Sequence, residues 1–138
     1  MVGAYPTAFS ASMTQSVSNI HHNQVLVFDN ALINNGGAYN PKSGIFTSNT
    51  KGVYVLFSTI TTDPGKSLEA FIYRNGVEFC RVYSGDSTMY SAGSNMAILA
   101  LDVGDNVMMK IHDHFHDTGV TIDGAFSSFS GYLLYETD

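Results

Sequence analysis

The chain has 138 residues, which corresponds to one domain that buries enough surface to fold without a disulfide or a metal. Its net charge of −6 disfavours nucleic acids and anionic membrane surfaces as partners, since both require basic patches, and no stretch of about 18 apolar residues could span a membrane. Only 13% of the residues are charged and 44% are hydrophobic, so we expect considerable surface to be buried between subunits.

Short segments rich in β-branched and aromatic residues follow one another along the chain, and no long window shows helical periodicity. In chain order they are VLVF (25–28), GVYVLFSTI (52–60), SLEAFIYR (67–74), MAILALDV (96–103), NVMMKIH (106–112) and GYLLYE (131–136). The turn signals between them are NNGG (34–37), DPGK (63–66), NG (75–76) and GDN (104–106). Asn75-Gly76 is the strongest signal, because both residues accept the positive φ angles of a type I′ hairpin turn. This punctuation predicts an all-β sandwich or barrel.

The hairpin that turns at Asn75-Gly76 continues into Phe79 and Cys80, which as neighbours in a strand point to opposite faces. Phe79 has the larger apolar area, so we expect it in the core and Cys80 on the outer face, shielded by neighbours. Cys80 is the only cysteine, which excludes an intrachain disulfide. We expect its thiol to behave as a small apolar group.

The strand predicted over 106–112 has two faces. Val107, Met109 and Ile111 share one face by the period of two, and we expect that face to lie in the core. The opposite row ends at His112 and continues with His114 and His116 if the strand persists.

This continuation, KIHDHFHDTG (110–119), contains His112, His114 and His116 together with Asp113 and Asp117. Imidazoles suit Zn²⁺ or Cu²⁺, but three alternate residues spaced about 6.7 Å apart could share one ion only if the chain bends. The alternatives are a solvated polar loop and a glycan-contacting loop, since loops at the end of a rigid sandwich often carry binding.

Six motifs occur in register along the chain: AFSAS (8–12), VFDN (27–30), YNPKSGIF (39–46), GVYVLF (52–57), LDVGDNV (101–107) and SFSGYLLYE (128–136). Their order and spacing resemble the globular C1q domain over nearly the whole chain. The resemblance implies a ten-stranded jelly-roll β-sandwich of the C1q/TNF superfamily over residues 1–138, with residues 1–6 loose and three copies assembled as a homotrimer. It also implies that the strand over 106–112 lies in the sheet turned away from the trimer axis, so that the row of histidines faces solvent near one end of the domain. The glycines of the motifs are expected to be structural: Gly44, Gly52, Gly104 and Gly131.

The chain also departs from the family pattern. Ser48 stands where the family often has Cys, and Leu56 interrupts an aromatic motif whose Phe57 is displaced by one position. The sequence contains no Gly-X-Y collagen repeat before the first motif, so we expect a head without a collagen stalk. The chain therefore resembles the collagen-less C1q-domain proteins of invertebrates, which are secreted, carbohydrate-binding recognition proteins of innate immunity.

The resemblance also points to the segment RVYSGDSTMYSAG (81–93), because some members hold Ca²⁺ there near the trimer apex. Calcium takes six to eight oxygens, whereas this segment has Asp86 as its only carboxylate and Ser91 at one family carboxylate position. As a sugar-binding surface the segment offers rings for stacking and charged groups for hydroxyls: Arg81, Tyr83, Asp86 and Tyr90. The alternatives are tyrosines half-buried in the sheet and Asp86 in a surface turn.

We therefore expect a secreted, homotrimeric, glycan-binding module of innate defence. The alternative is a protein-ligand head that binds a receptor in signalling or assembly. Calcium is the one cofactor to consider. We expect no membrane insertion, no nucleic-acid partner and no enzymatic activity, because no nucleophile elbow accompanies the Gly-Asp-Ser at 85–87.

Overall fold

A computed structural model describes residues 5–138, without the side chains of residues 113–116. Its strands are β1 (Ala8–Ser12), β2 (Asn30–Asn35), β3 (Tyr39–Asn40), β4 (Ile45–Thr47), β5 (Gly52–Thr62), β6 (Ser67–Arg74), β7 (Val77–Gly85), β8 (Ser91–Leu101), β9 (Asn106–His116) and β10 (Ser128–Glu136). The helical element of the described chain is η1 (Gly124–Phe126), a single 3-10 turn, so no described helix has the length and apolar character to cross a membrane. The expectation of a loose N-terminus falls largely on residues 1–4, which lie outside the described residues.

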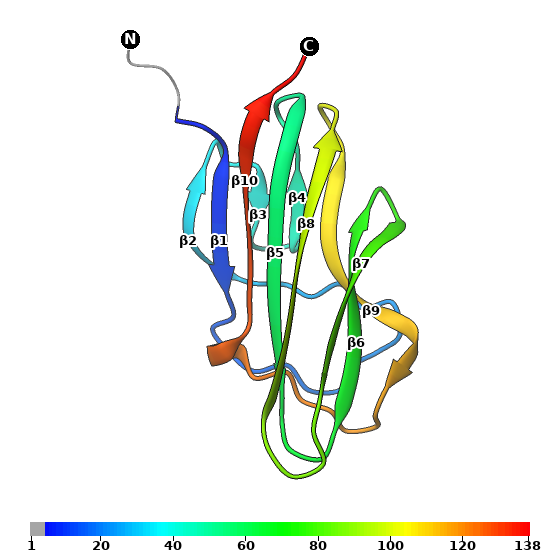
Figure 1. The fold of residues 1–138 in the computed structure, drawn as a ribbon. Coiled ribbons are helices and arrows are strands. Elements are labelled where there is room, and N and C mark those ends of the chain that lie inside the picture. Colours follow the sequence, from blue (N-terminus) through cyan, green and yellow to red (C-terminus); the bar gives the residue numbers. More distant parts are fainter. Residues whose placement is uncertain (1–4) are drawn as a thin grey trace.

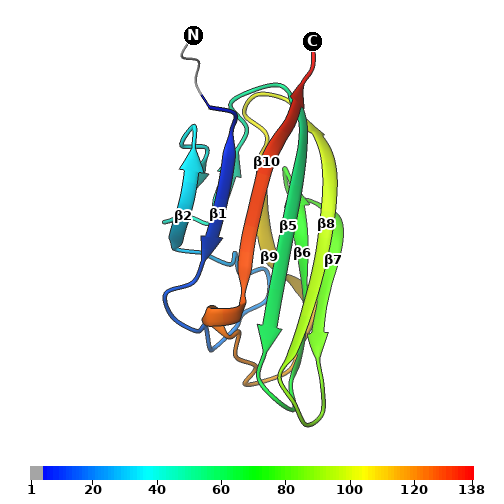
Figure 2. The same ribbon diagram turned by 60° about the vertical axis from the view of Figure 1, so that its left-hand side comes forward.

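The strands form two five-stranded antiparallel sheets that face each other (Figures 1 and 2). Sheet A has the order β2-β1-β10-β5-β8 and sheet B the order β3-β4-β9-β6-β7. The start of β1 and the end of β10, here called the chain ends, lie at one end of the sandwich, and the loops β5–β6 and β7–β8 lie at the other (Figure 1). The predicted all-β, ten-stranded jelly roll is confirmed.

The segment 25–28 is the one predicted strand that is wrong. Val25 forms only an isolated bridge to Lys110, and the Leu26 amide donates to the Met109 carbonyl at 2.8 Å. Leu26 and Phe28 are nevertheless fully buried. The hydrophobic run therefore reflects the burial of these side chains beside β9 and not a regular strand.

Aromatic rings from both sheets fill the core between them. Phe9 of β1 stacks on Tyr39 of β3 with ring centroids 4.7 Å apart, and Phe129 of β10 meets Phe9 edge-on at 5.0 Å. The Tyr39 hydroxyl donates to the Phe28 carbonyl at 2.8 Å, and burial raises the pKa of Tyr39 to about 12. A Cβ on Gly131 would lie 2.9 Å from the Phe9 ring, which explains why this motif position lacks a side chain.

The predicted division of β9 into two faces is confirmed, since Val107, Met109 and Ile111 are fully buried. The prediction for β7 is wrong: Phe79 is 52% exposed, whereas Cys80 packs against the core. The pairing of β6 with β7 shifts between Ile72 and Tyr73. This β-bulge places Cys80, and not Phe79, in the row of side chains that points into the core.

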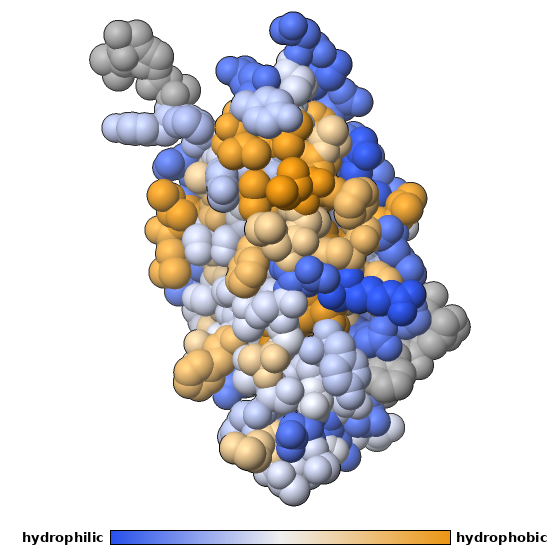
Figure 3. Space-filling view, in the orientation of Figure 1, coloured by the Kyte–Doolittle hydropathy of each residue, from blue (hydrophilic) through white to orange (hydrophobic). Residues whose placement is uncertain are grey.

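The outer face of sheet A changes character along its strands. Its upper part carries an apolar patch, the orange area of Figure 3. The outward rows of β5, β8 and β10 contribute Val53, Phe57, Met96, Ile98, Tyr132 and Leu134, with Val55 almost covered among them. One row further down, Thr59 pairs with both Ser94 and Ser128. The face is therefore apolar near the chain ends and hydroxyl-bearing towards the opposite end.

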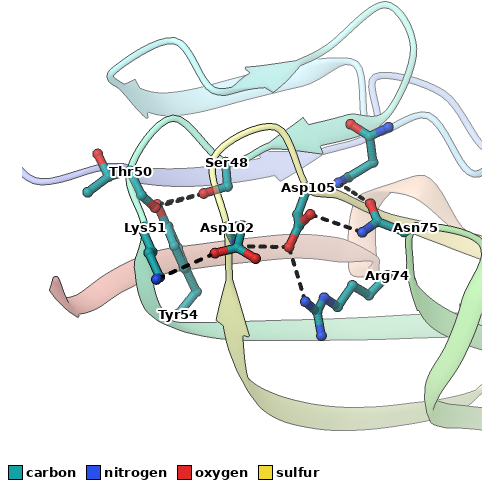
Figure 4. Close-up of polar contacts among 9 residues, drawn as sticks. Ser48, Thr50, Lys51, Tyr54, Arg74, Asn75, Asp102 and Asp105 are labelled. Atoms are coloured by element: carbon teal, nitrogen blue, oxygen red, sulfur yellow. Dashed lines mark hydrogen bonds and ion pairs between the residues drawn. The ribbon is translucent and has the colours of Figure 1, made fainter. Parts of the chain in front are cut away.

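A network centred on Asp105 fixes the turns at the end where the chain ends lie (Figure 4). Its carboxylate accepts from the Asn75 amide at 3.0 Å, the Asp102 backbone amide at 2.8 Å and the Arg74 guanidinium at 3.2 Å. Asn75 and Gly76 have φ angles of 48° and 80°, so the predicted hairpin turn is confirmed. Near this network, the buried Ser48 hydroxyl donates to the Thr50 carbonyl at 2.8 Å. The hydroxyl therefore has a hydrogen-bond partner at the position where the family often has cysteine.

Candidate ligand-binding site

Three segments far apart in the sequence meet at the end of the sandwich opposite the chain ends. They are the loop between β5 and β6, the end of β7 with its following loop, and the residues after β9 (Figure 1). Between them lies a hollow of about 270 Å³, here called the end groove, lined by Gly65, Lys66, Ser67, Tyr83, Gly85, Asp86, Ser87 and Asp117. Three predicted site residues thus come together: Tyr83, Asp86 and Asp117.

Reciprocal hydrogen bonds hold Asp117 against the start of β6. Its carboxylate accepts from the Ser67 amide at 2.7 Å and the Ser67 hydroxyl at 2.9 Å, while its own amide donates to the Ser67 carbonyl at 2.9 Å. The carboxylate position is therefore set by the backbone of β6 as well as by its own segment.

Asp86 is fixed by the loop that it begins. Its Oδ1 atom accepts from the backbone amides of Thr88 at 2.9 Å and Met89 at 3.1 Å, as in an Asx turn. These bonds lower the pKa of the Asp86 carboxyl, so the group is ionised at neutral pH. The Gly65 amide donates to the Asp86 carbonyl at 2.8 Å, which joins the two loops of the groove.

Tyr83 contributes the aromatic surface of the groove. It lies on the outward row of β7 and is 55% exposed, so about half of the side chain is covered, as the alternative of a half-buried tyrosine expects, and the rest faces the groove. Across the groove, Lys66 and the two carboxylates supply charges of both signs. A ring face beside charged acceptors and a charged donor can bind a small ligand that has both apolar edges and hydroxyl groups.

The other two predicted residues of this segment lie apart from the end groove. Arg81 lies on the outer face of sheet B, with its guanidinium 4.9 Å from the centroid of the Phe71 ring and 3.8 Å from the Glu69 carboxylate. Tyr90 is 63% exposed and lines a different hollow, on sheet A, together with Phe126.

His112 also differs from expectation, because its side chain is only 19% exposed. The imidazole stacks on the buried Phe71 ring at 4.6 Å, and its Nε2 lies 3.9 Å from the Glu78 carboxylate. The prediction that this row faces solvent is therefore wrong at His112. The predicted side chains of Asp113, His114 and His116 lie outside the described residues.

The described residues do not fit a calcium ion. Among them no group of three or more His, Cys, Asp or Glu side chains could hold a metal. Asp86 already accepts two amides of its own loop through one oxygen, and the Ser91 hydroxyl accepts from the Gly85 amide at 3.1 Å. Two separate carboxylates fall well short of the six to eight oxygens that calcium takes.

The sequence pattern missed the contribution of the β5–β6 loop. Lys66 and Ser67 line the end groove, but the DPGK segment was interpreted only as a turn. The signal that could have revealed them is topological: β5, β6 and β7 are long strands that run up and down in turn, so this loop and the loop after β7 reach the same end of the sandwich.

Comparisons with known proteins agree with the fold. Residues 8–134 match the C1q domain. Over 135 residues the chain is 31% identical to human Complement C1q tumor necrosis factor-related protein 2, covering 96% of this chain and 46% of the relative. It is 26% identical over 133 residues to Heavy metal-binding protein HIP of Mytilus edulis, covering 96% of this chain and 62% of the relative. The chain thus spans less than two thirds of the length of either protein.

Two solved structures show the same fold. The globular domain of zebrafish complement 1qA superimposes with a TM-score of 0.77 at 19% identity, covering 95% of this chain and 99% of that one. Eiger TNF from S. frugiperda superimposes with a TM-score of 0.73 at 12% identity, covering 97% and 96%. With the domain matched over nearly its whole length and the jelly roll in place, the chain belongs to the C1q domain family.

Proposed function

We propose that this protein is a secreted recognition module of innate defence that binds glycans in the end groove and acts as a homotrimer. The observation that carries the proposal is the exposed Tyr83 ring beside the fixed carboxylates of Asp86 and Asp117. We expect neither catalysis nor nucleic-acid binding.

The groove chemistry suits a sugar ring. A pyranose has C–H faces that stack on an aromatic ring, and hydroxyl groups that need acceptors and donors in fixed positions. Asp86 and Asp117 are acceptors that backbone amides already hold in place, so binding a ligand would cost little conformational entropy at these side chains. Lys66 adds a donor on the same groove.

The apolar patch on sheet A supports the proposed assembly. Its residues come from three adjacent strands and are paired side by side, as Phe57 is with Met96 and Val55 with Ile98. Apolar side chains in one continuous, exposed area mark a protein interface. Stable homo-oligomers bury such areas, commonly more than about 2,000 Å² per interface.

A glycan array with a monosaccharide-competition step tests the binding proposal. The protein should bind defined glycans, and a free monosaccharide should displace it. Tyr83→Ala should lose the signal, whereas Tyr83→Phe, which keeps the ring, should retain most of it. An array without signal would instead favour the receptor-binding alternative, which the likeness to Complement C1q tumor necrosis factor-related protein 2 supports.

Metal binding is a second candidate function, favoured by the likeness to Heavy metal-binding protein HIP and by the alternate histidines from His112 to His116. Zn²⁺ titration by calorimetry should show binding at pH 7.5 that is lost in acid, because protonated imidazole is not a ligand. Combined change of His114 and His116 to Ala should abolish it while leaving the Phe71–His112 stack in place. Equal Zn²⁺ binding by this variant would refute the candidate.

A further inference from the structure

The end groove lies away from the surface through which we propose that the subunits assemble. Tyr83 belongs to the outward row of β7, because its neighbour Val82 is buried in the core. It therefore faces outward from sheet B, whereas the apolar patch lies on sheet A. The two loops of the groove lie at the end of the sandwich opposite the chain ends (Figure 1). Assembly through the apolar patch thus leaves the groove open to a ligand.

The charged side chains that line the end groove are more negative than positive. They are Asp86, Asp117 and Lys66. The ion pairs between described residues do not include Lys66, so its ammonium group neutralises neither carboxylate by direct contact. The whole protein has a net charge of −6, which adds to the negative potential at the groove. The groove therefore favours a cationic group over an anionic one.

One oxygen of the Asp86 carboxylate is left for a ligand. The Oδ1 atom accepts from the Thr88 amide at 2.9 Å, the Met89 amide at 3.1 Å and the Thr88 hydroxyl at 3.3 Å. No described residue donates a hydrogen bond to the Oδ2 atom. The bonds to Oδ1 hold the carboxylate in place and lower its pKa, so Oδ2 is a fixed acceptor that carries negative charge at neutral pH.

An ammonium group is a better partner for this acceptor than a neutral hydroxyl group. Both can donate a hydrogen bond to Oδ2, but only the ammonium group also gains Coulomb attraction to Asp86 and Asp117. Solvent limits this gain at a surface site, where one ion pair changes an affinity by a factor of about 1.5 to 5. We therefore expect a modest preference for a cation, and one that salt weakens.

We propose that the end groove prefers sugars that carry a free ammonium group, such as an unacetylated hexosamine, over neutral and acidic sugars. The sugar ring stacks on Tyr83 and its ammonium group binds Oδ2 of Asp86. Lys66 donates to a ring hydroxyl oxygen, as it can to any sugar. This preference rests on the proposed function, because it assumes that sugars bind in the end groove.

Four sugars with the same ring test the preference: glucosamine, N-acetylglucosamine, glucose and glucuronate. Each is titrated into the intact protein in its native assembly at pH 6.5, where the sugar amine is protonated, and followed by the amide chemical shifts of the groove. Glucosamine should bind about fivefold more tightly than glucose. N-acetylglucosamine, which fills the same position without charge, should bind about as glucose does, and glucuronate more weakly. The preference for glucosamine should shrink in 1 M salt, where the Debye length is about 3 Å.

The outcomes separate the preference from the proposed function. If glucosamine binds no more tightly than glucose, or than another neutral sugar that shifts the groove, the preference is overturned and the proposed function stands. If no sugar, charged or neutral, shifts the groove, the proposed function is itself contradicted.

Two variants locate the charge that causes the preference. Asp86→Asn keeps Oδ1 as acceptor for the loop amides but removes the charge, and should lower the ratio of glucosamine affinity to glucose affinity at least about twofold. Asp63→Asn is the matched control, since Asp63 accepts from the Thr121 amide at 3.0 Å in the same β5–β6 loop and does not line the groove. It removes an equal charge and should leave the ratio unchanged. An unchanged ratio in Asp86→Asn, with the parent thermal transition retained, would show that this carboxylate does not select the ligand.

Discussion

Cys80 illustrates how one side chain's surroundings determine its chemistry. It lies half-buried opposite Ile72 against the core, and burial raises the pKa of its thiol. The thiolate is the reactive form, so the folded protein should react with iodoacetamide far more slowly at pH 7.5 than the urea-unfolded chain does. Cys80→Ser should cost about 1 kcal/mol, because a hydroxyl replaces a thiol in an apolar setting. Equal alkylation rates for the two states would show that the thiol is accessible.

Asp105 predicts an acid-sensitive contribution to stability. Hydrogen bonds from the Asn75 side chain and the Asp102 amide, with the nearby Arg74, lower the pKa of its carboxyl. Because the folded-state pKa is lowered, the ionised carboxylate stabilises the folded protein at pH values above the unfolded pKa near 3.8. This stabilisation is lost as pH falls through the folded-state pKa. Urea unfolding should therefore show Asp105→Ala about 1–3 kcal/mol less stable than the parent at pH 7.

The difference between Asp105→Ala and the parent should shrink in the same titration as pH falls below 3.8, because the unfolded parent chain then takes up a proton on this carboxyl while the folded one, with its lowered pKa, does not. Lys51→Ala serves as a control, since its ion pair with Asp102 is 4.0 Å long and mostly exposed. This change should alter stability by less than about 0.5 kcal/mol. A constant difference between Asp105→Ala and the parent from pH 7 to pH 3 would contradict the account.

Single-residue orientation was predictable where the strand is regular and not where it is irregular. The alternation in β9 placed Val107, Met109 and Ile111 correctly in the core. The bulge in β7 reversed the expected order of Phe79 and Cys80, because a one-residue shift exchanges the two faces. No local signal in the sequence marks that bulge.

At the scale of strands, Gly93 allows two edge strands from opposite sheets to approach each other. A Cβ on Gly93 of β8 would lie 1.7 Å from the Tyr83 carbonyl oxygen of β7. Backbone, not a flexible side chain, would have to move, so Gly93→Ala should destabilise the fold by about 2–4 kcal/mol in urea unfolding. It should also disturb Tyr83, and hence the end groove.

Gly104→Ala is the matched control for Gly93→Ala. Gly104 has a φ of 91° but open space where a Cβ would lie, so this change strains the backbone without a clash. It should cost only about 1–2 kcal/mol. A smaller loss for Gly93→Ala than for Gly104→Ala would show that the approach of β7 and β8 is not tight.

Alternation and turn residues predicted β5, β6, β8, β9 and β10, but not the strands β1 to β4. Two further differences are informative. The run at 25–28 looked like a strand because burial alone produces a short apolar run. The strand β8 begins at Ser91, five residues before the apolar segment that was predicted, because small and polar residues there still pair with β5. Tertiary structure outweighs local propensity in both cases, through burial at 25–28 and through strand pairing at the start of β8.

For the whole molecule, the apolar patch predicts assembly. Sedimentation equilibrium at micromolar concentration should give about three times the monomer mass of 14.9 kDa. Ile98→Asp places a charge inside the patch and should give a monomer. Val77→Asp changes an equally exposed apolar residue on sheet B and should leave the trimer intact. A monomeric parent protein, or a trimeric Ile98→Asp variant, would refute the proposed interface.

The candidate site could be predicted only in part. Tyr83, Asp86 and Asp117 were recognisable as residue types suited to a sugar, but the sequence gives no distance between segments 30 residues apart. The meeting of three loops depends on the topology of both sheets, which is why Lys66 and Ser67 were missed. Arg81 and His112 were also predicted to bind ligand, but both side chains lie on the outer face of sheet B against Phe71.

Amide chemical-shift mapping with the monosaccharide that competes best on the glycan array tests the central claim most directly. The proposed site predicts saturable shifts confined to the end groove, at Lys66, Ser67, Tyr83, Asp86 and Asp117. Tyr83→Ala should remove them without changing the thermal transition. Saturable shifts at another surface, with the end groove unaffected, would contradict the account.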